Sequence, residues 1–474
     1  MTATEFFTFL KRKFPFDLTS EQEEVLRMLA SFCVDGKKGQ VFLLKGYAGT
    51  GKTTLLSVLN SQLWHLKMKA VQLAPTGRAA KVIRLYSGKE ASTIHRKIYN
   101  PKSEPGGGVK FVLARNTHRD TLFLVDEASM IPDQPSDQKM FENGSLLQDL
   151  IKYVDSGVRC KLILIGDTAQ LPPVRSDLSP ALDEHTLSLS FSKEVQPAEL
   201  TDVVRQAAES GILVNATRIR EQLQEEFFEQ FQFELVGYPD IVRLVDGYEI
   251  QEAIDESYSE VGREETALIV RSNKRAIRYN QTIRQKILFL DQEVAIGDYL
   301  MVVRNNYFWL DPKSEAGFVA NGDIVELLEL FGIKELYGFR FAEAKVKLVD
   351  YPDQKPFETV LLLDTLNGEG PSLSYEESNR LYQSVREDYA DEKSNYKRFL
   401  AVKNNKYFNA LQVKFAYALT CHKSQGGQWS RVFVEQPYLP DGVNRDYLRW
   451  LYTAVTRARE KLYLIGFPGS FFAE

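Results

Sequence analysis

The sequence predicts an α/β protein with two lobes, each built on a parallel β-sheet and each carrying an insertion. Short, continuous apolar runs alternate with helical patterns in both halves of the chain, which is typical of strands buried on both faces of a parallel sheet. The first of these runs leads through a glycine-rich segment into a helix. A chain of 474 residues also exceeds what one hydrophobic core usually contains.

The first lobe is predicted over residues 1–190. Residues 18–30 form a helix in this interpretation, because Thr19 can cap it and acidic residues fill its first turn. Turn-forming residues flank a short strand-like patch at 98–120, which predicts a hairpin insertion. The segments that follow parallel strands should meet in one crevice at the carboxyl edge of the sheet. The expected strands of this lobe cover residues 41–44, 70–74, 121–125 and 161–165.

The second lobe is predicted over residues 191–293 and 412–474, with strands at 267–270, 415–419, 432–434 and 462–465. Residues 294–411 have a different character: the early part alternates like a small β-barrel, and the later part is charged and helical in pattern. Residues 219–265 have a largely helical pattern. The aromatic side chains at 227–233 within them favour core packing over a base-stacking platform.

Composition places the protein among ordinary globular proteins, with 44% apolar and 26% charged residues. The net charge of −5 implies that any nucleic acid is bound by local basic surfaces. Three cysteines, far apart in the chain, favour a reducing compartment. The charge order of the N-terminus is wrong for a secretory signal, and no apolar run has membrane-spanning length. We therefore expect a cytoplasmic protein with no membrane partner.

The glycine-rich segment is GYAGTGKT, residues 46–53. Its small residues let backbone N–H groups surround a triphosphate at a helix N-terminus. Lys52 can reach the β- and γ-phosphates, and the Thr53 hydroxyl can bind Mg²⁺. A glycine turn with an incidental Lys-Thr pair is the alternative, and the strand and helix on either side argue against it. The predicted ATP-binding residues of the segment are Gly46, Ala48, Gly49, Thr50, Gly51, Lys52, Thr53 and Thr54.

Acidic and amide side chains follow two of the predicted strands. Asp126 can hold Mg²⁺ together with Thr53, and Glu127 can polarise the water that attacks the γ-phosphate. Gln170 follows the run at 161–165 and can sense the γ-phosphate, the alternative being a capped turn into the prolines beyond it. These residues and the glycine-rich segment predict an ATP-hydrolysing site with Mg²⁺ as cofactor.

The motifs together resemble superfamily 1B helicases of the RecD/Dda branch, over nearly the whole chain and most weakly across 210–265 and 328–410. The resemblance implies two RecA-like motor domains, an SH3-like barrel in the second, and 5′-to-3′ travel on single-stranded DNA. The matching segments are, in order, GYAGTGKTT, LAPTGRAAK, STIH, VDEASM, GDTAQLPPV, LTDVVRQ, YALTCHKSQGGQW and LYTAVTRARE.

The resemblance also assigns roles to individual residues. Gln22 matches a glutamine that reads adenine, and Arg205 and Arg457 match arginines that the second lobe directs at the γ-phosphate. A surface salt bridge with Glu460 is the alternative for Arg457. The expected DNA contacts combine apolar stops with hydroxyls and cations that face the phosphate backbone. They are Pro75, Thr76, Arg78, Thr93, His95, Val174, Thr420, His422, Lys423 and Ser424.

The expected activity is that of an ATP-dependent helicase, which closes its two lobes on ATP and moves along single-stranded DNA. Its partners would be single-stranded DNA and tailed duplexes, bound by a monomer, with Phe111 in the hairpin as the candidate wedge between strands. Three alternatives remain open: a DNA-stimulated translocase that remodels protein–DNA complexes without unwinding, a nucleic-acid-binding module without catalysis, and an RNA substrate in place of DNA.

Overall fold

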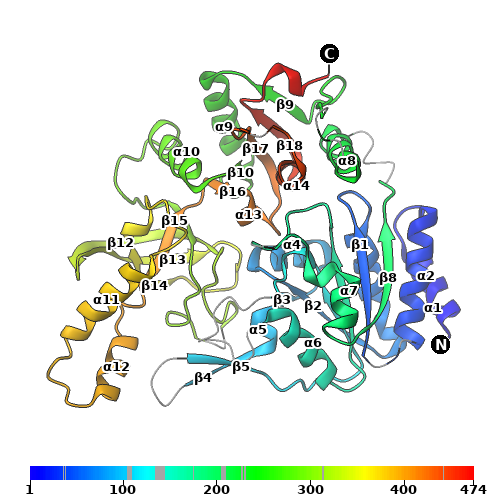
Figure 1. Ribbon diagram of the computed structural model, residues 1–474, viewed down its shortest axis with the longest axis horizontal. Coiled ribbons are helices and arrows are strands. Elements are labelled where there is room, and N and C mark those ends of the chain that lie inside the picture. Colours follow the sequence, from blue (N-terminus) through cyan, green and yellow to red (C-terminus); the bar gives the residue numbers. More distant parts are fainter. Residues whose placement is uncertain are drawn as a thin grey trace.

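The computed structural model shows two α/β lobes, with a barrel and two helices attached to the second (Figure 1). It describes residues 1–35, 37, 39–103, 109–133, 145–174, 176–203, 210–225, 228, 231–311, 314–440 and 442–473. Both sheets are parallel, and the barrel interrupts the second, so the predicted fold class is confirmed. Within these residues, we found no helix long and apolar enough to cross a membrane.

The first sheet has six parallel strands in the order β3-β2-β6-β7-β1-β8. Their bounds are Gln40–Gly46 (β1), Lys69–Ala74 (β2), Ala91–Thr93 (β3), Thr121–Val125 (β6), Lys161–Gly166 (β7) and Glu194–Leu200 (β8). All four strands predicted from apolar runs are present. The edge strands β3 and β8 were not predicted, and β8 extends the first sheet beyond residue 190, the predicted end of this lobe.

Helices cover both faces of the first sheet (Figure 1). They are Ala3–Lys13 (α1), Ser20–Asp35 (α2), Lys52–Gln62 (α3), Gly77–Ser87 (α4), Ile94–Ile98 (α5), Leu146–Ser156 (α6) and Glu184–Leu189 (α7). The helix predicted from residue 18 is α2. Thr19 and Gln22 exchange hydrogen bonds at its start, where the backbone N–H of each donates to the side-chain oxygen of the other.

The predicted hairpin is present, as β4 (Tyr99–Ser103) paired antiparallel with β5 (Val109–Leu113). Phe111, however, is only 6% exposed, and its ring centroid lies 4.2 Å from that of Tyr307 in the second lobe. Because the ring is packed between lobes, the proposal that Phe111 is an exposed wedge is wrong. Residues 104–108 between the two strands lie outside the described residues.

The second sheet has five parallel strands in the order β16-β10-β17-β18-β9. They are Ile241–Leu244 (β9), Thr266–Val270 (β10), Ala418–Thr420 (β16), Trp429–Glu435 (β17) and Ala458–Ile465 (β18). Strand β9 lies in the region predicted to be largely helical. Phe231 and Phe233 of the same region are buried in the core of this lobe, as predicted, whereas Phe227 is outside the described residues.

Five helices accompany the second sheet: Gly211–Gln224 (α8), Gly247–Val261 (α9), Asn273–Lys286 (α10), Cys421–Ser424 (α13) and Arg445–Val455 (α14). Helix α14 has a strongly apolar face, so Tyr447, Leu448, Leu451 and Val455 are all buried. This packing determines the direction in which the remaining side chains of α14 project, and those of Arg449, Tyr452 and Thr453 form hydrogen bonds with the first lobe.

The insertion is a closed five-stranded barrel, with two helices between its fourth and fifth strands. Its strands are Tyr299–Val302 (β11), Ile324–Leu336 (β12), Phe339–Leu348 (β13), Phe357–Leu362 (β14) and Leu411–Phe415 (β15), and its helices are Tyr375–Glu387 (α11) and Asn395–Lys403 (α12). The strand predicted at 415–419 is therefore divided, since β15 closes the barrel against β11 and β16 joins the second sheet.

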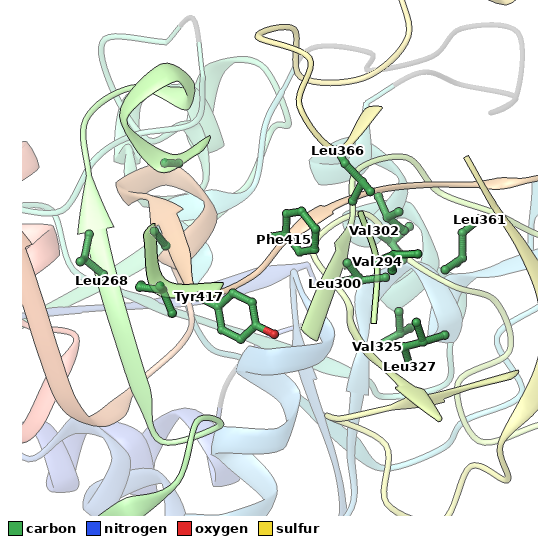
Figure 2. Packing of buried hydrophobic residues seen from close by; sticks show 14 of the residues in the cluster. Leu268, Val294, Leu300, Val302, Val325, Leu327, Leu361, Leu366, Phe415 and Tyr417 are labelled. Carbon is green, nitrogen blue, oxygen red and sulfur yellow. The ribbon is translucent and has the colours of Figure 1, made fainter. Parts of the chain in front are cut away.

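The barrel and the second sheet share one apolar core, which runs from Leu268 of β10 past Phe415 to Val302 and Leu361 in the barrel (Figure 2). A buried ion pair joins the same two parts, because Arg284 Nε of α10 lies 2.9 Å from Asp298 Oδ1, just before β11. The Tyr417 hydroxyl donates to the same oxygen. The barrel is thus continuous with the second lobe.

Candidate functional site

The glycine-rich loop connects β1 to α3, the strand-to-helix context in which such loops bind phosphate. Gly49 and Gly51 have φ angles of +78° and +86°, which residues with side chains rarely adopt. Gly51 is the N-cap of α3 and has no side chain to satisfy the first N–H groups of the helix. Those N–H groups and the helix dipole favour an anion at this point.

Lys52 is the first residue of α3, and its amine donates to the carbonyl oxygens of Gly46 at 2.6 Å and Tyr47 at 2.7 Å. The Thr50 hydroxyl also donates to the Tyr47 carbonyl, so the loop is closed by its own side chains. To reach a β- or γ-phosphate, the Lys52 amine would have to exchange these carbonyl oxygens for phosphate oxygens.

Three carboxylates lie beyond the loop, at the ends of β6 and β7. Asp126 and Glu127 follow β6, Asp167 follows β7, and Asp126 Oδ1 accepts the Glu127 N–H at 2.8 Å. Glu127 has a left-handed backbone, with φ of +54°. Burial raises the pKa of all three carboxyl groups, and Lys52 opposes that rise. A raised pKa makes a carboxylate a stronger base at neutral pH, which suits Glu127 to accept a proton from water.

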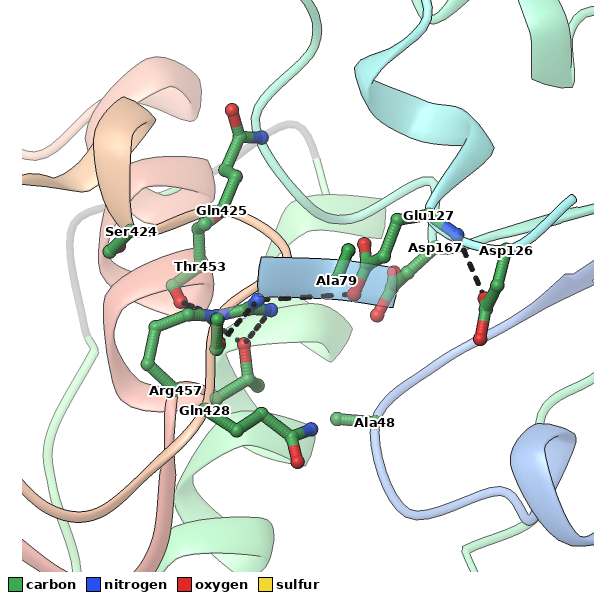
Figure 3. A network of polar contacts seen from close by, with 12 residues as sticks. Ala48, Ala79, Asp126, Glu127, Asp167, Ser424, Gln425, Gln428, Thr453 and Arg457 are labelled. Carbon is green, nitrogen blue, oxygen red and sulfur yellow. Dashed lines mark hydrogen bonds and ion pairs between the residues drawn. The ribbon is translucent and has the colours of Figure 1, made fainter. Parts of the chain in front are cut away.

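Arg457 enters the same site from the second lobe (Figure 3). It is 2% exposed, and its Nη1 lies 3.9 Å from Glu127 Oε1 across the gap between lobes. The guanidinium is held in place by donating to the carbonyl oxygens of Thr453 and Gly427 and to the Thr456 hydroxyl. A surface salt bridge with Glu460, the alternative considered above, does not describe this buried residue.

A cavity of about 500 Å³ lies between the lobes and contains most of these groups. It is lined by Gln22, Ala48, Gly49, Gly51, Lys52, Thr53 and Thr54 from the start of the chain, by Asp126, Glu127, Asp167 and Gln170, and by Gly426, Gln428, Thr456 and Arg457 from the second lobe. The described residues that were predicted for the nucleotide site line this cavity, except Gly46 and Thr50. Arg205 lies outside the described residues.

The residues present fit a magnesium ion. Thr53 and Asp126 both line the cavity, and Asp126 uses one carboxylate oxygen for the Glu127 N–H, which leaves the other for a ligand. Mg²⁺ prefers oxygen ligands and typically binds through one or two protein groups together with phosphate oxygens and water. When bound here, the ion would neutralise charge on the β- and γ-phosphate oxygens.

The two glutamines that the first lobe contributes to the cavity, Gln22 and Gln170, have different hydrogen-bond environments. Gln22 donates from Nε2 to the Thr50 carbonyl at 3.0 Å, so it supports the loop from the end of the cavity that Phe14 and Phe16 also line. Gln170 is buried, and its Oε1 has no hydrogen-bond partner among the residues that the structure describes. An unpaired buried acceptor is costly, and a water or ligand donor in the cavity would satisfy it.

Several second-lobe residues that the sequence reasoning missed hold the site from the opposite side. The Tyr452 hydroxyl accepts the Ala48 N–H and donates to Asp167 Oδ2. Thr453 Oγ1 accepts the Leu171 N–H, and Gln425 donates to the Leu171 carbonyl. All three lie within the quoted segments YALTCHKSQGGQW and LYTAVTRARE, but those motifs do not show that these side chains face the first lobe.

The expected nucleic-acid contacts lie beside the cavity, at the carboxyl edges of both sheets. Thr76 begins α4 and Thr93 begins α5, each hydroxyl accepting an N–H of its own helix. A Cβ on Gly426 would lie 3.1 Å from the Thr76 hydroxyl and 2.8 Å from Ala79 Cβ, so the glycine permits close contact between the lobes. Thr420, His422 and Lys423 stand across this contact, around the start of α13.

Other expected contacts vary in exposure. Val174 is 69% exposed, and an apolar side chain must be exposed if nucleic-acid bases are to pack against it. Pro75 is half-buried. His95 is partly buried, and burial lowers its pKa to about 4, so its ring is neutral at physiological pH. It can therefore contact a base or donate one hydrogen bond, but it cannot neutralise a phosphate.

Two of the expected contacts are used inside the protein. Ser424 is fully buried, and its hydroxyl donates to the Cys421 carbonyl. Arg78 stacks on Trp429, with 4.1 Å between its guanidinium carbon and the ring centroid, and lies 3.7 Å from Asp350 of the insertion. Both placements differ from the prediction, because the sequence reveals neither that α4 packs against the second lobe nor that the Ser424 hydroxyl is buried within its own helix. We do not retain these two residues as DNA contacts.

Both halves of the chain resemble known proteins. The family model described as an AAA domain matches residues 17–233, and the model described as a UvrD-like helicase C-terminal domain matches residues 415–465. The ATP-dependent RecD2 DNA helicase of Deinococcus radiodurans is 31% identical over 201 residues, which are 41% of this chain and 23% of that protein. The ATP-dependent DNA helicase dda of Enterobacteria phage T4 is 24% identical over 492 residues, covering 95% of this chain and 99% of that protein.

The lengths of the relatives differ widely. The chain spans 38% and 23% of the first two curated relatives that it matches, and nearly the full length of the phage protein. Among solved structures, one of Pif1 helicases on forked duplex DNA is 15% identical, with a TM-score of 0.46, covering 97% of this chain and 95% of that one.

Proposed function

Because the chain belongs to the superfamily 1B helicases, in the branch that includes RecD and Dda, we propose that it is an ATP-dependent DNA helicase that moves 5′-to-3′ along single-stranded DNA. The main support for this proposal is the cavity that both lobes line, where Lys52 and Glu127 of the first lobe face Arg457 of the second. A nucleotide bound there touches both lobes, so its turnover changes how strongly they are drawn together.

Each residue of the site has a distinct part in this proposal. Lys52 and the loop N–H groups bind the phosphates, and Glu127 accepts the proton of the attacking water. Arg457 stabilises negative charge that develops on the γ-phosphate, as an arginine finger supplied within one chain. Thr53 and Asp126 would hold Mg²⁺. Hydrolysis then removes the γ-phosphate that Arg457 and Lys52 share, and the attraction between the lobes weakens.

The proposed path for the strand crosses Thr76 and Thr93 of the first lobe and Thr420, His422 and Lys423 of the second. Hydroxyls and cations along such a path would contact the phosphate backbone without reading its sequence. Because the two groups lie on different lobes, closing and opening would shift one group relative to the other. The 5′-to-3′ direction rests on the family resemblance.

We expect DNA binding to weaken as pH rises through about 8. Burial, assisted by neighbouring Lys414, lowers the pKa of Lys423 to about 8, so its amine is charged below that pH and neutral above it. Only the charged form attracts phosphate, and DNA itself would favour that form. Fluorescence anisotropy with labelled single-stranded DNA from pH 7 to pH 9, at constant ionic strength, measures the loss.

The matched variant for this measurement is Lys423→Arg, because a guanidinium stays charged throughout the range. It should flatten the pH dependence, whereas Lys274→Arg, at an exposed lysine of the same lobe, should leave it unchanged. An equally steep fall in Lys423→Arg would show that another group titrates, and Lys423 would no longer be assigned to the DNA path.

Strand displacement on duplexes with a 5′ or a 3′ single-stranded tail tests the proposed function. We expect ATP-dependent unwinding from the 5′ tail alone, and none with Lys52→Ala, which removes the phosphate-binding amine. Lys67→Ala, at an exposed lysine beyond α3, is the control and should unwind like the wild type. Unwinding from the 3′ tail would contradict the direction, and ATP hydrolysis without displacement on either substrate would contradict the helicase activity.

A further inference from the structure

The Tyr452 hydroxyl is the point at which the second lobe touches both the phosphate loop and the end of β7. Tyr452 lies on α14 and is 1% exposed, and its side chain projects across the gap between lobes. Its oxygen accepts the Ala48 N–H at 2.9 Å, and its proton goes to Asp167 Oδ2 at 2.6 Å. One phenol therefore joins three elements that belong to two lobes.

Asp167 depends on this contact. The carboxylate is almost fully buried, and its other oxygen, Oδ1, accepts the Ala169 N–H. A hydrogen bond of 2.6 Å between a hydroxyl and a carboxylate is in the range of strong, charge-assisted bonds. Burial beside Asp167 raises the pKa of Tyr452 well above its usual value, so the phenol remains a donor at any physiological pH.

The residue after Tyr452 holds the other end of the same loop. Thr453 Oγ1 accepts the Leu171 N–H at 2.8 Å. Between the two attachment points, at Asp167 and Leu171, lies Gln170, which lines the cavity with a buried Oε1. Arg457 is connected to the same loop through Thr453, because its Nε donates to the Thr453 carbonyl. In Figure 3, Thr453 and Arg457 lie on one side of the site and Asp167 and Ala48 on the other.

We propose that Tyr452 is a positioning residue for ATP hydrolysis. Its hydroxyl forms hydrogen bonds with both Ala48 and Asp167. These bonds hold the loop that contains Gln170 in a fixed position relative to Lys52 and Arg457 when the lobes are closed. The inference rests on the proposed function. Tyr452 acts through its neighbours, since its hydroxyl has both hydrogen bonds within the protein. Its contribution is to geometry in the transition state, and the phosphate loop binds ATP without it.

Tyr452→Phe tests this role, because it keeps the ring and removes only the hydroxyl. The variant leaves an Asp167 oxygen and the Ala48 N–H buried without that partner, so Gln170 and Arg457 lose their alignment. We expect kcat for DNA-stimulated ATP hydrolysis to fall about 100-fold, the cost of a small misplacement in a catalytic site. The KM for ATP should stay close to the wild-type value. Steady-state kinetics at saturating single-stranded DNA separates the two constants.

Tyr447→Phe is the matched control. Tyr447 lies on the same helix, is completely buried, and donates its hydroxyl proton to Gln436 Oε1 at 2.6 Å, away from the cavity. Tyr447→Phe removes one buried hydrogen bond, whereas Tyr452→Phe removes two, and it should keep wild-type kcat. Equal kcat in the two variants, or a rise in KM without a fall in kcat, would overturn the positioning role.

A second variant keeps the inference testable should Tyr452→Phe not fold. Thr453→Val preserves side-chain shape and removes the hydroxyl that accepts the Leu171 N–H, so it releases the other end of the loop and should also lower kcat at unchanged KM. Wild-type kcat in Thr453→Val would contradict the inference. If the wild-type protein does not hydrolyse ATP in the presence of DNA, the proposed function is wrong. If the wild type is active and both variants keep its kcat, only the positioning role of Tyr452 is wrong.

Discussion

Replacing Arg457 with lysine is expected to lower kcat for ATP hydrolysis by about 10³-fold, the lower end of the range for arginine fingers. Lysine keeps the positive charge but presents a single ammonium group in place of a planar fork. It cannot bond the Thr453 carbonyl, the Gly427 carbonyl and the Thr456 hydroxyl while also reaching toward Glu127. The charge would therefore no longer be held where the γ-phosphate reacts.

The measurement is DNA-stimulated phosphate release at saturating ATP, together with binding of a fluorescent ATP analogue. Binding should change far less than kcat, because Arg457 acts mainly on the transition state. Arg445→Lys is the control, since it makes the same substitution at an exposed position of the neighbouring helix α14. A kcat for Arg457→Lys within tenfold of the control would remove Arg457 from the catalytic set.

Glu127→Gln should lower kcat by about 10²- to 10⁴-fold, the range attributed to a positioned general base. Glutamine has the same length and suits the left-handed backbone at this position as well as glutamate does, but it cannot accept the proton of the attacking water. The loss should therefore fall on hydrolysis, while ATP and DNA binding persist. Single-turnover hydrolysis with radiolabelled ATP, beside an ATP-binding titration, distinguishes these steps.

Glu184→Gln provides the comparison, because Glu184 pairs with Lys45 at the surface of the same lobe. It should hydrolyse ATP at the wild-type rate. If Glu127→Gln lost ATP binding in proportion to activity, Glu127 would be a binding residue, and the identity of the base would have to be reassigned.

Periodicity predicted most of the two sheets because their central strands are continuous apolar runs. Strands β1, β2, β6 and β7 are buried on both faces, and each appeared at its predicted position. Edge strands lack that signal. Strand β8 contains Pro197 and pairs on one side with β1 alone, and β9 has only four residues, so neither was distinguishable from its surroundings.

The division of residues 411–420 between two sheets could not be predicted for a related reason. Apolar residues run on from Phe415 to Leu419 without a turn-forming residue, so local pattern does not show where β15 leaves the barrel and β16 enters the second sheet. Pairing decides it, because Phe415 lies opposite Leu300 and Thr420 lies beside Val270. Those partners are more than a hundred residues away in the chain.

The nucleotide site shows the same contrast. Lys52, Thr53, Asp126 and Glu127 were named from the sequence because each belongs to a short motif whose spacing follows from one strand, one turn and one helix. Tyr452, Thr453 and Gln425 were not named, since their partners Ala48, Asp167 and Leu171 belong to the other lobe. Arg78 was assigned to DNA for the same reason, since its partners Trp429 and Asp350 are far away in the sequence.

By itself, then, the sequence determined the two parallel sheets, the barrel insertion and the phosphate loop, and it supplied the candidates for the reacting groups, because contiguous residues encode strand burial, glycine conformations and motif spacing. Only the tertiary structure decided how α14 approaches the phosphate loop and which polar groups bridge the lobes. The physical reason is that such bridges depend on two surfaces being packed together, and each surface is built from segments hundreds of residues apart.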